Sequence, residues 1–261
     1  MVDGLVPKLP WRVATVVATE SENESARSIT FEVPGWGGHL AGQHVDVKLT
    51  AEDGYSAQRS YSLSRPADGE RIELTVQQID DGEVSPYLAA VCPGEEIELR
   101  GPIGGWFVWR PAEVRRILLV AGGSGIVPLM AMLRQRVLLG AAEFRLVYSV
   151  RSPADVYYAE ELGRLERDCE WLQVAVAYTR AAAPQIARRP GRIGHGDLAV
   201  PGWMPDDGPR IYVCGPTGFV ESVTAKLIGQ GHSPAAIRTE RFGPATIPER
   251  GNDDRTDARR R

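Results

Sequence analysis

The spacing of apolar residues changes near residue 111, and this change restricts the folds that the chain can adopt. Before that point, short segments rich in Val, Ile, Thr and Tyr alternate apolar with polar residues, as half-buried strands do. One helical segment, 84–91, interrupts them and ends before Pro93-Gly94. The predicted strands are 12–19, 28–33, 43–49, 59–64, 71–79 and 95–100. This pattern favours an antiparallel β-barrel, which we expect over residues 1–110.

Beyond residue 111, near-continuous apolar strands alternate with helical segments. The predicted strands are 116–121, 144–150, 171–177, 210–214 and 236–240, and the predicted helices are 126–139, 158–167 and 217–228. Such alternation is typical of a parallel sheet covered by helices on both faces. We therefore predict a two-domain chain, with an α/β parallel-sheet domain over 111–247. Residues 248–261 are predicted to form a disordered charged tail, because they are almost entirely polar.

Composition excludes several classes of function. The formal net charge is −4, so no overall positive field attracts nucleic acid. The three cysteines form neither a closed disulfide set nor the four thiolates of a zinc or iron–sulfur site, and we expect no metal site. No apolar run approaches the roughly 18 residues of a spanning helix. Residues 1–12 carry charges and two prolines, unlike a signal peptide, so we expect a cytoplasmic protein.

The run Arg59-Ser60-Tyr61-Ser62 lies on a predicted strand and is suited to a phosphate-bearing planar ring. Alternation places Arg59 and Tyr61 on one face and the two serines on the other. An arginine pairs bidentately with phosphate, a tyrosine lies along a planar ring, and a hydroxyl bonds a ring nitrogen. Taken alone, however, these four residues are explained more simply as a half-buried strand with a polar face.

Two further runs in the first domain are rich in glycine. Gly82-Glu83-Val84-Ser85-Pro86 begins the predicted helix, where free N–H groups and the helix dipole favour an anion. An ordinary serine cap is an equally good interpretation of this run. Residues 101–107 form a glycine-dense turn between the two domains, and three glycines beside two aromatic residues exceed what a simple linker needs.

Two runs in the second domain lie between a strand and a helix. In the loop 122–128, glycines allow the backbone to approach a pyrophosphate, although Pro128 stands where the dinucleotide fingerprint has its third glycine. Cys214-Gly215-Pro216 lies at the carboxyl end of a predicted strand, the edge at which parallel sheets bind ligands. For a lone cysteine, a buried structural thiol is the simpler interpretation.

These five runs occur in the order and spacing of the ferredoxin–NADP reductase-like flavoproteins, which the chain resembles from about residue 11 to residue 244. The resemblance implies an FAD-binding barrel followed by an NAD(P)-binding domain. It implies that Arg59 holds a flavin phosphate, that Tyr61 flanks the isoalloxazine and that Ser62 bonds near the flavin N5. The implied FAD-binding residues are Arg59, Ser60, Tyr61, Ser62, Gly82, Val84 and Ser85.

The same resemblance implies a pyridine-nucleotide site in the second domain. Gly123, Ser124 and Gly125 would cradle the nucleotide, and Cys214, followed by Gly215 and Pro216, would lie beside the nicotinamide. The segment 239–244 resembles the Glu-x-Phe-Gly-Pro ending of flavohaemoglobin reductase modules. This ending would bring Glu240 and Phe242 close to the flavin, with Phe242 as a ring that the nicotinamide displaces or lies beside. The expected catalytic residues are Ser62, Cys214, Glu240 and Phe242.

The choice between NADH and NADPH depends on two loops. Arg151 follows the second strand of the second domain, and Thr179 and Arg180 follow the third. An arginine in either place can meet a 2′-phosphate, which favours NADPH slightly, although a surface arginine is an equally simple interpretation.

Neither a fused iron–sulfur domain nor a globin is present in the sequence, so we expect the electrons to leave for a separate molecule. The family favours a ferredoxin that serves an oxygenase. The alternatives are a reductase of free flavin or of a quinone-like small molecule, and a flavin- or nucleotide-binding regulatory subunit without turnover. The presence of Ser62, Cys214 and Glu240 together favours an enzyme.

Overall fold

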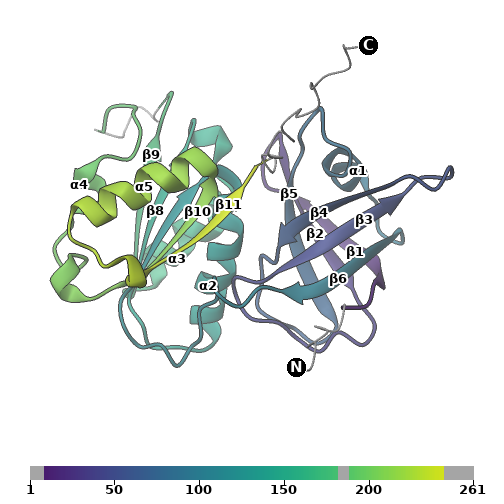
Figure 1. The fold of residues 1–261 in the computed structure, drawn as a ribbon, viewed down its shortest axis with the longest axis horizontal. Helices are drawn as coiled ribbons and strands as arrows, with labels where there is room; N and C mark the ends of the chain where they lie inside the picture. Colours follow the sequence, from purple (N-terminus) through teal and green to yellow (C-terminus); the bar gives the residue numbers. More distant parts are fainter. Residues whose placement is uncertain (1–8, 182–187, 244–261) are drawn as a thin grey trace, which may run out of the picture.

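The computed structural model describes residues 9–181 and 188–243, which form two sheets lying side by side (Figure 1). The first sheet is antiparallel, in the order β4-β3-β6-β1-β2-β5. An isolated bridge between Leu63 and Leu74 links the ends of the order, beyond β4 and within β5, so the sheet closes on itself as a barrel. Its strands are β1 (Arg12–Ser21), β2 (Ala26–Glu32), β3 (His44–Thr50), β4 (Ser56–Ser62), β5 (Arg71–Gln77) and β6 (Glu96–Ile103).

Alternating side chains of these strands fill the barrel. Val45 and Val47 of β3, and Ile97 and Leu99 of β6, belong to one fully buried apolar cluster. The short helix α1 (Ser85–Ala90) contributes Leu88 to the same cluster. The predicted antiparallel barrel is therefore confirmed, with the strand and helix bounds shifted by a few residues.

The second sheet is fully parallel, in the order β11-β10-β7-β8-β9. Its central strand has apolar residues on both faces, because Leu119 packs into one buried cluster with α2 and α3 while Leu118 packs into another with α5. The strands are β7 (Ile117–Gly122), β8 (Phe144–Val150), β9 (Leu172–Tyr178), β10 (Arg210–Pro216) and β11 (Ile237–Phe242), and the helices are α2 (Ile126–Leu138), α3 (Ala159–Asp168), α4 (His195–Leu198) and α5 (Thr217–Gly229). The predicted α/β parallel-sheet domain is confirmed.

Two details differ from the sequence interpretation. β6 continues through Gly101 to Ile103, so the turn between the sheets begins only at Gly104. Gly101 allows close packing within the strand, because a Cβ there would lie 2.8 Å from Cγ1 of Val45. The predicted helix 158–167 begins one residue later, because Tyr158 has a φ of 55°. The predicted domain limits at 110 and 247 stay predictions, and the predicted tail, 248–261, lies outside the described residues.

Candidate functional site

Three of the four predicted catalytic residues, Ser62, Cys214 and Glu240, come together where β3 and β4 of the barrel face the carboxyl ends of β10 and β11. On the barrel, Ser62 pairs in register with His44. On the parallel sheet, Cys214 pairs in register with Glu240. The two pairs meet across the gap between the sheets, where Nδ1 of His44 lies 4.0 Å from Oε1 of Glu240. Figure 1 shows β11 ending close to the barrel.

Glu240 is a buried carboxyl with an altered proton affinity. Its side chain is 19% exposed, and burial raises its pKa from 4.5 to about 7, which the nearby Ser62 hydroxyl partly offsets. Burial also lowers the pKa of His44, against the opposing charge of Asp46. Both shifts favour neutral side chains at neutral pH, and 4.0 Å is a long separation for an ion pair. We therefore regard Glu240 and His44 as a contact that can hold a proton, not as a formed salt bridge.

Ser62 provides the test of whether a flavin fits this place. The residue is 4% exposed, and its Oγ meets the geometry of a hydrogen bond with no described residue, although it lies close enough to the Glu240 carboxyl to lower the pKa of that group. A buried hydroxyl normally has a partner, because leaving one unpaired costs about 1–3 kcal/mol. The Ser62 hydroxyl therefore fits a ligand atom such as a flavin ring nitrogen.

Cys214 is fully buried at the end of β10. Burial, together with the Glu240 carboxylate, raises the pKa of its thiol well above the usual value. The thiol is therefore protonated at neutral pH and unsuited to nucleophilic chemistry. A buried, protonated thiol can shape a binding site without reacting in it.

The predicted phosphate-binding residues of the barrel also come together. Arg59 on β4 pairs with Glu83 at 2.7 Å, and the Tyr55 hydroxyl donates to the same carboxylate. Glu83 immediately precedes Val84 and Ser85 at the start of α1, so the guanidinium and the helix start are neighbours. Glu83 was not among the predicted site residues, because a single carboxylate in a glycine run carries no distinctive pattern.

The neighbours of Arg59 on β4 have different surroundings. Tyr61 is half-buried against the barrel core, and burial raises the pKa of its hydroxyl to about 12. The Ser60 hydroxyl donates to Asp46 at 2.6 Å, and Asp46 forms an ion pair with Arg100. The Ser60 side chain is thus engaged within the sheet, and its expected role in binding the cofactor stays a prediction.

Two of the predicted helix-start residues have local roles. The Ser85 hydroxyl accepts the N–H of Ile79, so it closes a turn as well as flanking α1. Gly82 donates its N–H to the Ile79 carbonyl, and a Cβ on Gly82 would lie 2.8 Å from the Ser85 Oγ. This tight turn fixes the start of α1 beside Glu83.

The glycine loop of the second domain lies directly on β10. Gly123, Ser124 and Gly125 form one short 3₁₀ turn between β7 and α2. A Cβ on Gly125 would lie 2.2 Å from the carbonyl oxygen of Cys214, so only glycine allows this approach. Gly123 has a φ of 54° and faces open space, which suits a backbone that approaches a ligand.

Phe219 on α5 is a site residue that the sequence interpretation missed. A Cβ on Gly122 would lie 2.7 Å from its ring, and a Cβ on Gly215 would lie 2.9 Å from it. The ring therefore covers the two glycines at the ends of β7 and β10. Pro216, the last residue of β10, directly precedes α5. A lone aromatic residue in a predicted helix gave no signal of this position.

Two further expectations concern the edges of the site. Arg151 and Arg180 are both exposed, and the N–H of Arg180 donates to the Arg151 carbonyl at 2.9 Å. Thr179 joins the same turn through the carbonyl of Val150. Phe242 is partly buried against the core of the second domain at the end of β11. The structure thus brings the two arginine loops together and separates them from Phe242 by the width of the sheet.

Two family models match consecutive parts of the chain. The oxidoreductase FAD-binding domain matches residues 13–108, and the oxidoreductase NAD-binding domain matches residues 119–225. Within residues 9–181 and 188–243, no helix is both long enough and apolar enough to cross a membrane.

The relatives and solved structures come from several electron-transfer systems. Ferredoxin–NADP reductase B of Sorangium cellulosum is 29% identical and aligns over 88% of this chain and 96% of its own length. The ferredoxin–NAD(P)+ reductase component of the naphthalene 1,2-dioxygenase system of Pseudomonas putida is 28% identical over 89% of this chain and 69% of its own. The crystal structure of the FAD/NAD-binding domain of nitric oxide dioxygenase from Vibrio cholerae is 26% identical, with a TM-score of 0.79, over 89% of this chain and 99% of that one.

The chain also matches flavohaemoproteins of Vibrio cholerae and Chromobacterium violaceum. It spans about three fifths of the length of these two relatives.

Proposed function

The chain belongs to the ferredoxin reductase-like oxidoreductases that join an FAD-binding domain to an NAD-binding domain, and we propose that it oxidises NAD(P)H through FAD for a separate electron acceptor. The observation that carries this proposal is the buried Ser62 hydroxyl opposite the Cys214–Glu240 edge, which has no hydrogen-bond partner of good geometry in the part of the chain that the structure describes. A ligand bound where the two cofactor domains meet would supply the hydrogen bond that this hydroxyl lacks.

The residues of the chain bind and orient, whereas FAD supplies the redox chemistry when bound, accepting a hydride from the nicotinamide and releasing electrons to the acceptor. We propose that Arg59 and the start of α1 hold the flavin phosphates, with the Arg59–Glu83 pair opening to release the guanidinium. Tyr61 lies along the ring system, and Ser62 donates to a ring nitrogen.

On the second domain, the glycine turn 123–125 holds the nucleotide phosphates. The neutral thiol of Cys214 lies beside the nicotinamide and adds no charge there. The Phe242 ring covers this nicotinamide position until the nucleotide binds. Glu240, with a pKa of about 7, holds a proton within reach of Ser62 at neutral pH. Orientation of the two rings is the largest effect that the chain contributes, of the order of several kcal/mol.

Anaerobic mixing with NADH and with NADPH tests this proposal. The yellow absorbance of the FAD-loaded protein is expected to bleach with at least one nucleotide. Bound flavin that fails to bleach with either would favour the alternative, a regulatory subunit without turnover.

For the nucleotide, we propose a preference for NADPH. The exposed side chains of Arg151 and Arg180, whose backbones share a hydrogen bond, support it, since neither forms an ion pair with a described residue and an arginine here can meet a 2′-phosphate. The ratio of kcat/KM for the two nucleotides tests the preference, and a marked preference for NADH would refute it.

For the acceptor, we propose a ferredoxin that serves an oxygenase. Support comes from the names of two relatives, the naphthalene dioxygenase reductase component and the glycine betaine monooxygenase reductase subunit of Pseudomonas aeruginosa. Addition of a ferredoxin is expected to increase cytochrome c reduction strongly. If host ferredoxins give no increase and free flavin or a quinone is reduced directly, the small-molecule reductase is the better assignment.

A further inference from the structure

A second contact joins the two domains through buried polar groups. On the NAD-binding domain it consists of Arg134 on α2 and Tyr158 at the start of α3. On the FAD-binding domain it consists of Glu22 in the β1–β2 turn, Ser64 just after β4, and Glu73 and Thr75 on β5. We call these six residues the polar contact. None of them carries a role in the proposed binding of either cofactor.

Arg134 makes bonds to both domains at once. Its Nη1 donates to the Ser64 carbonyl at 2.9 Å and to Glu73 at 2.7 Å. Its Nη2 donates to Glu161 of α3 at 2.6 Å. The side chain is 10% exposed, and although burial opposes the charge, the bonds and charges of Glu161 and Glu73 raise its pKa above the ordinary value. Only a guanidinium presents donors in such a fork, since a lysine ammonium is a point charge.

Tyr158 reinforces the polar contact from the next helix. Its hydroxyl donates to Thr75, and its N–H donates to the Glu22 carboxylate at 3.0 Å. The Arg134 guanidinium lies 4.8 Å from the centre of its ring. Its φ of 55° is a left-handed conformation that costs a non-glycine residue about 1–3 kcal/mol. Bonds to two elements of the other domain maintain this conformation.

In the sequence, residues of the polar contact lie close to residues of both proposed cofactor sites. Ser64 is two residues beyond Ser62, so Arg134 holds the chain just after the flavin-binding run. α2 begins directly after the glycine turn 123–125. Arg134 lies eight residues beyond the start of this helix, a rise of about 12 Å along its axis at 1.5 Å per residue. A single guanidinium thus connects the helix of the nucleotide loop to the strand of the flavin site.

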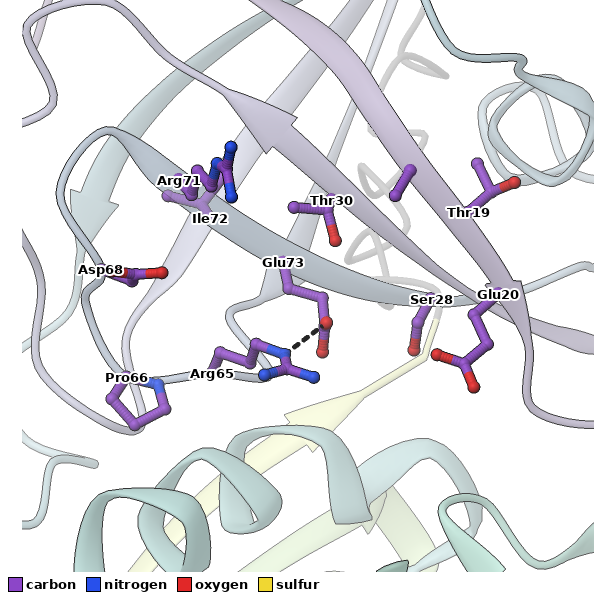
Figure 2. A pocket seen from close by; sticks show the side chains of 11 residues that line it. Thr19, Glu20, Ser28, Thr30, Arg65, Pro66, Asp68, Arg71, Ile72 and Glu73 are labelled. Carbon is purple, nitrogen blue, oxygen red and sulfur yellow. Dashed lines mark hydrogen bonds and ion pairs between the residues drawn. The ribbon is translucent and has the colours of Figure 1, made fainter. Parts of the chain in front are cut away.

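The surface of the FAD-binding domain is hollowed beside the polar contact. A cavity of about 400 Å³ adjoins Glu73 and is lined by charged and hydroxyl-bearing residues that include Arg65, Asp68 and Ser28 (Figure 2). Arg65 also pairs with Glu73, but its side chain is 55% exposed, so that pair is weak. All the residues that line this cavity belong to the FAD-binding domain, so the link between the two domains at this place is made by the buried bonds of Arg134 and Tyr158.

We propose that Arg134 is a positioning residue for hydride transfer, because it fixes the angle between the domains at which Cys214 and Glu240 lie opposite Ser62. The kinetic part of this inference rests on the proposed function, whereas the structural part does not. The competing explanation is that Arg134 only braces α2 against α3 through Glu161, within one domain.

Kinetics of the FAD-loaded protein test the first part. Arg134→Gln is expected to lower the limiting rate of anaerobic flavin reduction, per bound FAD, by about 10- to 100-fold, since a misplacement of about 1 Å costs up to that much. The Kd of the oxidised nucleotide should stay within about twofold, because the binding loop is untouched. Arg136→Gln is the matched control, because the contacts of Arg136 with described residues, to the Ala142 carbonyl and the Trp171 ring, stay within its own domain, and its rate should stay unchanged.

Double-mutant cycles separate the two explanations. Glu73→Gln removes the partner across the interface, and Glu161→Gln removes the partner within the domain. Positioning predicts that the effects of Arg134→Gln and Glu73→Gln on the limiting rate are strongly non-additive. Additive effects for that pair, with coupling to Glu161 alone, would overturn the proposal. Arg134→Lys should also be slow, and a wild-type rate in this variant would overturn it as well.

A distance measurement provides a readout that needs no turnover. Spin labels on the exposed Cys92 of the FAD-binding domain and on an Ile228→Cys variant of α5 report the separation of the domains, with Cys169→Ser as background. The distance distribution should broaden or shift in Arg134→Gln and stay narrow in Arg136→Gln. An unchanged distribution would overturn the proposal. If the wild-type protein is not reduced by either nucleotide, the proposed function fails, and the distances still decide whether Arg134 sets the domain angle.

Discussion

Replacing Glu240 with glutamine should change how the stability of the protein depends on pH. The carboxyl has an ordinary pKa of 4.5 and a pKa of about 7 in the folded chain, because burial disfavours its charge. Between these values the folded state binds more protons than the unfolded state, so the free energy of unfolding falls as pH rises through this range. The loss is complete above pH 7. Each pH unit between the two pKa values lowers the free energy of unfolding by about 1.4 kcal/mol, so the buried charge destabilises the protein by about 3 kcal/mol above pH 7.

Glu240→Gln removes this cost without changing the size of the side chain. At pH 8.5 the variant should be more stable than wild type by up to about 3 kcal/mol, which raises Tm by several degrees. At pH 4 the wild-type carboxyl is neutral in the folded protein and mostly neutral in the unfolded chain, so the two proteins should unfold at nearly the same denaturant concentration. Urea unfolding of the FAD-free proteins at both pH values measures the difference.

Glu221→Gln serves as the control, because Glu221 is an exposed carboxylate on α5. Its stability should follow the wild-type pH profile. The reasoning about Glu240 is wrong if Glu240→Gln also follows the wild-type profile at both pH values, because the carboxyl would then carry no buried charge above pH 7.

Three further predictions concern the two cofactor sites. Ser62→Ala should keep bound FAD but slow its reduction about tenfold, because the loss of one hydrogen bond costs about 1.4 kcal/mol. Loss of FAD instead would mean that the hydroxyl holds the flavin in place. Gly125→Ala places a methyl group 2.2 Å from the Cys214 carbonyl, so Tm should fall by several degrees, whereas Gly218→Ala, which meets nothing within 4 Å, should not lower it. Arg180→Ala should raise the KM for NADPH about tenfold and leave the KM for NADH unchanged. An equal rise in the two KM values would exclude contact between Arg180 and a 2′-phosphate.

The architecture was predictable because local patterns determine it. Period-two alternation identified the barrel strands, and the apolar run 116–121 followed by glycines identified the central strand β7 of the parallel sheet. The boundaries were less predictable. Gly101 was expected in a turn because glycine disfavours strands, but its position against Val45 needs a residue without a side chain inside β6.

The candidate site was predictable only where a residue lies within a recognisable run. Ser62 and Cys214 were identified in this way, each beside glycine- or serine-rich neighbours. His44, Glu83 and Phe219 stand alone in ordinary segments, and their places depend on register and on contacts made by the folded chain. Nothing in a lone histidine distinguishes one that meets a carboxyl at 4.0 Å from one on a surface.

The contact between the domains marks the limit of sequence reasoning most clearly. Glu22, Glu73 and Tyr158 occur in segments that, read separately, predict a turn, a strand and a helix start. Their common function depends on the relative position of two independently built sheets, which no local pattern encodes. Proton affinity at Glu240 has the same origin, because the carboxyl is buried only when β11 faces β3 and β4. If Arg134 fixes that arrangement, loosening the domains should also expose Glu240 to water and return its pKa toward 4.5, so the destabilisation caused by raising the pH should shrink in Arg134→Gln.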